Sequence, residues 1–168
     1  MSGSAMPKRI GQGMWALAWV ILLGLLYLYF DHSSAEKNDP NRALLSSADS
    51  APVILKRNRA GHYLAPGEIN GVPVKFLLDT GATTISIPQK VADKIGLSAG
   101  AERRVNTANG TVSVYAATLD SVKLGSITLQ SINGHINPHM QGNTVLLGMS
   151  FMRHLEMTQK GDYLTLKR

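Results

Sequence analysis

The chain has 168 residues, 44% of them hydrophobic and 17% charged, which suits one globular domain with appendages. It contains no cysteine, which excludes disulfides, thiol nucleophiles and thiolate zinc sites. The net charge of +6 resides in residues 51–168, where 13 Lys and Arg oppose 7 Asp and Glu. No aromatic pattern typical of a nucleic-acid module accompanies this excess, so we expect a solvated basic surface and no nucleic-acid partner.

A long apolar stretch lies near the N-terminus. From residue 10 to residue 30 the only clearly polar side chain is Gln12, and this length suits a helix that crosses the hydrocarbon core of a membrane. Lys8 and Arg9 precede the stretch, so the positive-inside bias places residues 1–9 in the cytoplasm. We therefore expect a single-pass membrane protein whose remaining chain is periplasmic or otherwise extracytoplasmic.

A cleaved signal peptide is the alternative interpretation of this stretch, because Ser33 and Ala35 offer a small-residue cleavage site. The stretch is longer than the usual apolar core of a signal peptide, and it ends in bulky aromatic residues. These two features favour an uncleaved transmembrane anchor at residues 10–30.

The rest of the chain divides into a linker and a β domain. Residues 31–52 are polar and rich in Ser, Asp and Asn, which predicts a flexible linker. In residues 53–168, short strand-like runs flank turn sequences typical of β-hairpins, and short helices are expected near residues 89–95 and 149–155. This pattern indicates a mostly β domain, either a barrel or a sandwich. The hairpin turn sequences are Asn70-Gly71, Asn109-Gly110 and Lys160-Gly161-Asp162.

The stretch VKFLLDTGATTISIP, residues 74–88, carries the strongest functional signal. It runs an apolar strand directly into Asp79, and a carboxylate at the end of a buried strand is costly unless another group pairs with it or uses it. Asp79 therefore either caps a turn or is kept there for chemistry.

This stretch resembles the active-site loop of retropepsin-like aspartic proteases, whose signature is two apolar residues, Asp, Thr or Ser, Gly, and Ala or Ser. The stretch TVLLGMSFMRHLEM, residues 144–157, is similar to the second motif of that family, apolar residues and a glycine before a short helix. The resemblance covers residues 61–168. Ser150 stands where many relatives carry an acidic or amide residue, and we expect this departure to change only local packing. The resemblance implies an all-β fold, a closed antiparallel barrel with one or two short helices, preceded here by a transmembrane helix.

The resemblance also implies an aspartic endopeptidase with Asp79 as the catalytic residue and with no cofactor or metal. Thr80, Gly81 and Ala82 would support the active-site loop, and Gly148 would pack beneath it. Two carboxyls about 3 Å apart share one proton and divide the roles of base and acid. Because the sequence holds a single Asp-Thr-Gly, we expect the second carboxylate from another copy of the chain, in a homodimer that binds a peptide or protein substrate.

The second predicted hairpin lies between the two motifs and is expected to form a flap over the substrate. Its tip comprises Thr107, Ala108, Asn109, Gly110 and Thr111. Lids that exclude water are mobile loops of this kind, and an ordinary surface hairpin is the alternative. The tip also fits a glycosylation acceptor, but the hairpin explains the residues without a sugar.

The sequence leaves other interpretations to weigh. His135 and His139 have a metal-like spacing, but Gly134 and Pro138 indicate a loop and no acidic ligand follows, so no metal site is expected. Two function classes besides a protease stay open. They are a catalytically weak peptide-binding module on the same fold and a structural dimerisation domain that tethers a membrane assembly.

Overall fold

The computed structural model describes residues 6–42, 44, 51–107 and 110–168, and the chain divides into two compact units, Met1–Asn38 and Asp39–Arg168. The first unit holds the helix α1 (Met6–Asn38), whose segment Gly13–Asp31 is apolar and unburied. Within the described residues it is the one helix long and apolar enough to cross a membrane, and a signal sequence passes the same criterion.

Helix α1 is longer than the predicted anchor. It continues through the polar residues that follow Phe30 and ends at Asn38, two residues before Pro40. A proline disfavours helical backbone in the residue before it, which explains the end of the helix at this point. The second unit begins at Asp39, so the first part of the predicted linker is helical and a further part belongs to the compact domain.

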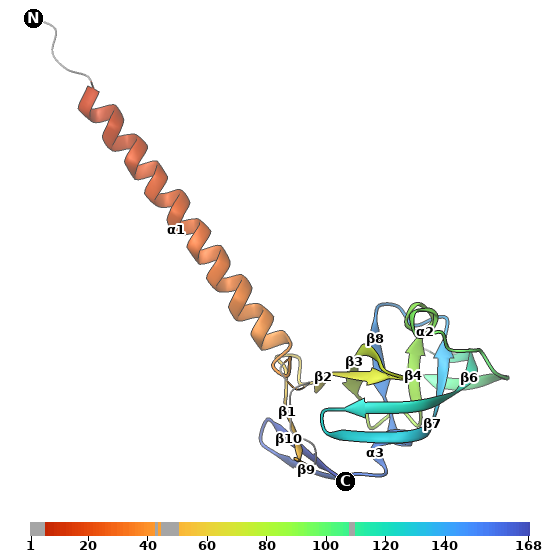
Figure 1. Cartoon of the computed structure of the whole chain (residues 1–168). Helices are drawn as coiled ribbons and strands as arrows, with labels where there is room; N and C mark the ends of the chain where they lie inside the picture. Colours follow the sequence, from red (N-terminus) through yellow and green to blue (C-terminus); the bar gives the residue numbers. More distant parts are fainter. Residues whose placement is uncertain (1–5, 43, 45–50, 108–109) are drawn as a thin grey trace, which may run out of the picture. The chain divides into compact units, whose positions relative to one another are not determined.

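The second unit is a closed β barrel (Figure 1). In the described residues its strands follow the order β2-β3-β8-β4-β7-β6, and a pairing of β6 with β2 closes the ring. The fold class predicted from the sequence is thereby confirmed. The strands are β2 (Leu64–Ile69), β3 (Val72–Leu78), β4 (Ile85–Pro88), β6 (Gly110–Leu124), β7 (Ile127–Asn137) and β8 (Thr144–Leu147).

Among the described strands the barrel is mostly antiparallel, and it contains two parallel pairs. Strand β8 runs parallel to β3, and β4 runs parallel to β7. Strands β3 and β4 follow each other in the chain, yet β8 lies between them. Parallel neighbours need a crossover connection rather than a hairpin, and hairpin turn signals carry no information about such pairs.

Two short helices and a second sheet complete the domain. Helix α2 (Gln89–Ile95) follows Pro88 and ends at Gly96, whose φ of 76° is left-handed, as the sequence predicts. Helix α3 (Met149–Met152) is shorter than predicted. The Arg153 N–H still reaches back four residues to the Met149 carbonyl, but the His154 and Leu155 N–H groups reach back only three residues, in a tighter turn. The second sheet has the antiparallel order β1-β10-β9, formed by β1 (Val53–Lys56), β9 (Glu156–Lys160) and β10 (Tyr163–Lys167).

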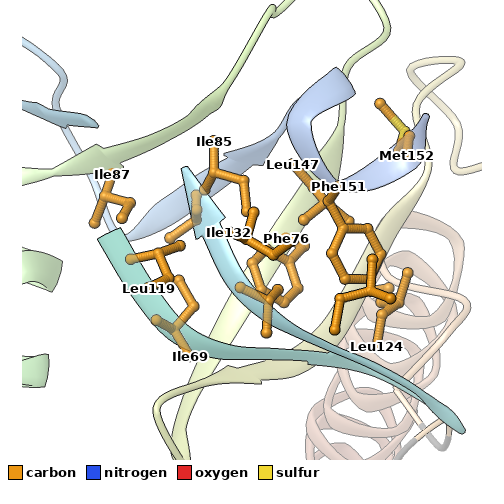
Figure 2. Close-up of a cluster of buried hydrophobic side chains, with 14 of the residues drawn as sticks. Ile69, Phe76, Ile85, Ile87, Leu119, Leu124, Ile132, Leu147, Phe151 and Met152 are labelled. Carbon is orange, nitrogen blue, oxygen red and sulfur yellow. The ribbon is translucent and has the colours of Figure 1, made fainter. Parts of the chain in front are cut away.

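The hydrophobic core fills the barrel beneath the predicted active-site loop. Phe76 on β3, Leu147 on β8 and Phe151 on α3 are fully buried and belong to the cluster of Figure 2. Phe76 also lies so close to Gly67 that a Cβ there would be 2.5 Å from its ring. Burial of each such side chain contributes about 1.5–3 kcal/mol, so Phe76 stabilises the strand that leads to Asp79.

Candidate active site

Asp79 directly follows β3, and the parallel pairing with β8 holds its backbone. Strand β3 ends at Leu78, which lies opposite Leu147 in the register. The Asp79 N–H donates to the Leu147 carbonyl at 3.1 Å, and the Leu78 N–H donates to the Tyr63 carbonyl at 3.0 Å. The two motifs singled out in the sequence, far apart in the chain, therefore meet at one point of the fold.

A tight turn surrounds the carboxylate. The Gly81 N–H donates to Asp79 Oδ1 at 2.9 Å, and the Ala82 N–H donates to the Asp79 carbonyl at 3.2 Å. A Cβ on Gly81 would lie 3.1 Å from Oδ1, closer than ordinary van der Waals contact. Glycine thus lets the backbone donor approach the carboxylate. Thr80 is exposed beside this turn.

The beginning of α3 clamps the other half of this loop. The Met149 N–H donates to the Ala82 carbonyl at 2.8 Å, and the Ser150 N–H donates to the Thr83 carbonyl at 2.9 Å. A Cβ on Gly148 would lie 2.6 Å from the Ala82 carbonyl oxygen. Only glycine allows this approach, so Gly148 lies beneath the loop for a steric reason.

Ser150 takes part in this clamp, a role the sequence analysis did not recognise. It is buried, and its Oγ accepts a hydrogen bond from the Ile85 N–H at 3.2 Å, just beyond the loop. Ser150 therefore contributes a hydrogen bond as well as packing. In the sequence, the sign of this role is a serine hydroxyl two residues after Gly148. Only the fold shows which backbone N–H group the hydroxyl meets.

His135 holds the far end of the loop. Its Nδ1 lies 2.8 Å from the Thr84 hydroxyl, and in the register it lies opposite Ser86 on the neighbouring strand β4. Burial lowers the pKa of His135 below its ordinary value of 6.5, because desolvation disfavours the charged ring. In the sequence, the spacing of His135 and His139 points to nothing beyond the metal site that is not expected there. Across the described residues, no group of three His, Cys, Asp or Glu could hold a metal ion.

The predicted flap hairpin is present as a hairpin. Strand β5 (Glu102–Thr107) pairs with β6 from Glu102 opposite Tyr115 to Thr107 opposite Gly110. At its tip the Thr111 hydroxyl donates to Asn106 Oδ1 at 2.8 Å. Ala108 and Asn109 lie outside the described residues. The role of this hairpin as a flap stays a prediction.

The barrel is closed and has six strands. Its Asp-Thr-Gly turn lies beside the helix α3, and Gly148 lets this helix approach the loop. This is the arrangement of the retropepsin-like class of aspartic proteases. The chain belongs to the gag-polyprotein putative aspartyl protease family, whose model matches residues 65–154. The match includes the first motif, the hairpin between the two motifs, and residues 144–154 of the second motif.

Known proteins similar to this chain include a solved structure and two curated relatives. The crystal structure of a retropepsin-like aspartic protease from Rickettsia conorii superposes with a TM-score of 0.60 at 33% identity, covering 69% of this chain and 89% of that one. An uncharacterized protein from the cobV 5' region of a Sinorhizobium species is 30% identical, over 95% of this chain and 75% of its own length. Uncharacterized protein RP867 of Rickettsia prowazekii is 28% identical over 85% of this chain, which spans 64% of that protein.

Proposed function

We propose that the chain is an aspartic endopeptidase in which Asp79 activates a water molecule for hydrolysis of a peptide bond. The observation that carries the proposal is the geometry of the Asp79 turn. The carboxylate follows the strand β3, whose Phe76 is buried in the core, accepts the Gly81 N–H and lies on a loop that Met149 and Ser150 hold by hydrogen bonds. Such a held carboxylate suits general base catalysis, because the group must be positioned toward the reacting water before the reaction.

The second carboxyl of the reaction is Asp79 of another copy of the chain. With one Asp-Thr-Gly per chain, a twofold axis brings the two Asp79 turns together in a homodimer. The ionised carboxylate takes a proton from water, and the resulting hydroxyl attacks the scissile carbonyl while the protonated partner donates to its oxygen. Thr80, exposed beside each turn, would bond across the axis and hold the two loops together.

Two further parts of the chain would serve this activity. The β5–β6 hairpin, including Thr107 and Gly110, would close over the peptide and exclude water from the reacting bond. Helix α1 would act as an uncleaved membrane anchor, with Lys8 and Arg9 on the cytoplasmic side and the domain on the other side. Confinement in the membrane would raise the effective concentration of the two copies.

Cleavage of a random peptide library by the full-length protein in detergent, at several pH values, tests the proposal. Asp79→Asn is expected to abolish cleavage while the circular dichroism spectrum stays that of wild type. Asp120→Asn, an exposed acid on β6, is the matched control and should retain activity. Full activity in Asp79→Asn would overturn the protease assignment, and peptide binding without cleavage by wild type would favour a binding module.

A further inference from the structure

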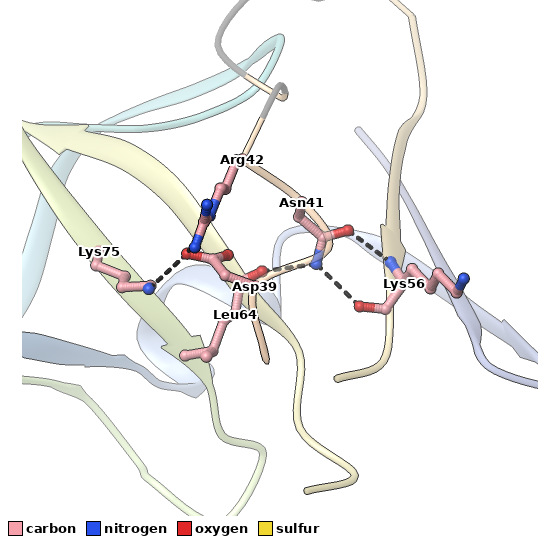
Figure 3. A network of polar contacts seen from close by, with 6 residues as sticks. All are labelled: Asp39, Asn41, Arg42, Lys56, Leu64 and Lys75. Atoms are coloured by element: carbon pink, nitrogen blue, oxygen red, sulfur yellow. Dashed lines mark hydrogen bonds and ion pairs between the residues drawn. The ribbon is translucent and has the colours of Figure 1, made fainter. Parts of the chain in front are cut away.

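A short segment at the beginning of the domain is bound tightly to the barrel. Asn41 is only 6% exposed, and its Nδ2 donates to the Lys56 carbonyl at 2.9 Å and to the Leu64 carbonyl at 2.7 Å (Figure 3). Its Oδ1 accepts the Lys56 N–H at 2.7 Å. Lys56 ends β1 and Leu64 begins β2, so one amide side chain joins the second sheet to the barrel.

An ion pair adds a second attachment. Asp39, whose side chain is 12% exposed, pairs with Lys75 Nζ at 2.5 Å, and Arg42 Nε lies 3.8 Å from the same carboxylate oxygen. Lys75 belongs to β3, the strand that ends at Asp79. Only the Asp39 carboxylate is largely removed from water, and Lys75 is 42% exposed, so this pair adds modestly to the Asn41 bonds. We call residues 39–42, with these bonds, the clasp.

The clasp shortens the free part of the chain between the apolar helix segment and the domain. A flexible linker over residues 32–52 would have a root-mean-square span of roughly 25 Å and a full extension of about 70 Å. With the clasp bound, only residues 32–38 remain between the apolar segment and the domain. They are helical, and seven helical residues rise by about 11 Å.

We infer that the clasp restricts this protease to peptide bonds close to the membrane surface, in segments that flank the membrane anchors of its substrates. The inference rests on the proposed function and on α1 as an anchor. Without the clasp, the domain would be attached at Val53 through the 21 residues 32–52, and with the clasp it is attached at Asp39. The active site therefore cannot move away from the membrane by the length of that linker. Cleavage sites far from the membrane are then excluded by reach rather than by sequence.

Two insertions of the same length distinguish a clasp that is bound to the barrel from a linker that is free. A Gly-Ser segment of about ten residues placed between Asn38 and Asp39 lies before the clasp, and the same segment placed between Ser47 and Ala48 lies after it. The chain has no cysteine, so Ser98→Cys, at an exposed position, allows a single fluorescent label on the domain. Energy transfer from this label to acceptor lipids in reconstituted vesicles reports the distance of the domain from the membrane.

The insertion before the clasp is expected to lower energy transfer, and the insertion after it should leave transfer at the wild-type value. Asn41→Ala combined with the later insertion should lower transfer as well, because the clasp no longer retains the domain. Equal losses of transfer from both insertions in the wild-type background would overturn the inference. This readout does not depend on proteolysis, so it decides the matter even if the proposed activity is absent.

Cleavage then tests the consequence for substrates. Reporters anchored in the same vesicles carry one library-derived cleavage sequence either next to the membrane or beyond a long, semi-rigid helical spacer that holds it away from the surface. The wild type and the variant with the later insertion should cut only the proximal reporter, while the variant with the earlier insertion should also cut the distal one. Equal cutting of both reporters by the wild type would overturn the substrate assignment, and no cutting of either would count against the proposed protease function alone.

Discussion

Several residues around Asp79 act through the backbone of its loop. Gly81 offers a donor to the carboxylate, Gly148 leaves room for the carbonyl of Ala82, and His135 meets the hydroxyl of Thr84. Gly81 and Gly148 tolerate few side chains, because an added Cβ would crowd the Asp79 carboxylate in one case and the loop carbonyls in the other. Substitutions there are expected to act on stability first and on catalysis through the position of Asp79.

Gly148→Ala should destabilise the domain. The added methyl would overlap the Ala82 and Thr84 carbonyl oxygens, and overpacking of this kind costs about 1–3 kcal/mol. Urea denaturation should show the loss as a lower midpoint with an unchanged slope. Gly24→Ala, where an added methyl meets nothing within 4 Å, is the control and should leave the domain transition unchanged. An unchanged midpoint in Gly148→Ala would contradict the steric role of this glycine.

His135 should make the stability of the domain depend on pH in the mildly acidic range. Its pKa is lowered in the folded state, so the unfolded chain binds a proton below pH 6.5 that the folded domain does not. The stability is fully present above pH 6.5 and is lost as the pH falls toward the folded pKa, by at most about 1.4 kcal/mol per pH unit.

Thermal unfolding of His135→Gln, which keeps a group able to bond Thr84, should show a flatter dependence on pH than wild type. His62→Gln removes an exposed imidazole and should retain the wild-type slope. Identical pH dependence in wild type and His135→Gln would show that this imidazole is not the group responsible.

Among the elements, α3 is small but holds the Asp79 loop in place. It follows β8 directly, and its first two N–H groups bond the carbonyls of Ala82 and Thr83. Phe151 and Met152 bury the other side of the helix in the core. The helix thus transmits the rigidity of the barrel to the loop that carries Asp79.

Ser150→Ala tests this link between helix and loop. Loss of the hydroxyl leaves the Ile85 N–H without its acceptor in a buried place, which costs about 1–3 kcal/mol. We expect reduced stability in denaturant and a kcat that falls more than KM rises, because the loop is displaced rather than the substrate contacts. Ser98→Ala, an exposed serine in the loop after α2, should change neither quantity. If a destabilised Ser150→Ala protein kept the wild-type kcat, the hydrogen bond between Ser150 and Ile85 would have no role in catalysis.

If each chain contributes one catalytic carboxyl, a single chain cannot act as a protease and a homodimer is required. A heterodimer of wild type and Asp79→Asn has a single ionisable group in the centre, so it cannot share a proton between two carboxyls. With random exchange and a ninefold excess of mutant, about one tenth of wild-type subunits would find a wild-type partner. Activity per wild-type chain should fall accordingly, measured after co-incubation in detergent.

The same excess of Asp120→Asn, which keeps its catalytic acid, should not suppress cleavage. Activity that stays proportional to wild-type protein, despite subunit exchange demonstrated by labelled chains, would contradict a shared active site. The wild-type activity should also depend on pH as a bell, since one carboxyl must be ionised and the other protonated.

Features that depend on neighbouring residues could be predicted from the sequence. The Asn-Gly turns predict hairpins because these residues accept positive φ, as at Asn70 and Gly71 with φ of 50° and 76°. The apolar stretch predicts a helix by length alone, and the family signature around Asp79 indicates the barrel and the class of chemistry.

Only the tertiary structure decided the contacts between residues distant in the chain. The bond of Thr84 to His135 joins residues 51 apart, and that of Ile85 to Ser150 joins residues 65 apart. The sequence places Asn41 in the predicted linker, yet this residue is buried. Its amide forms hydrogen bonds with backbone groups of Lys56, at the end of β1, and Leu64, at the beginning of β2. Turn and helix preferences act within a few residues, whereas the partner of a buried polar group is set by which strands the closed barrel brings together.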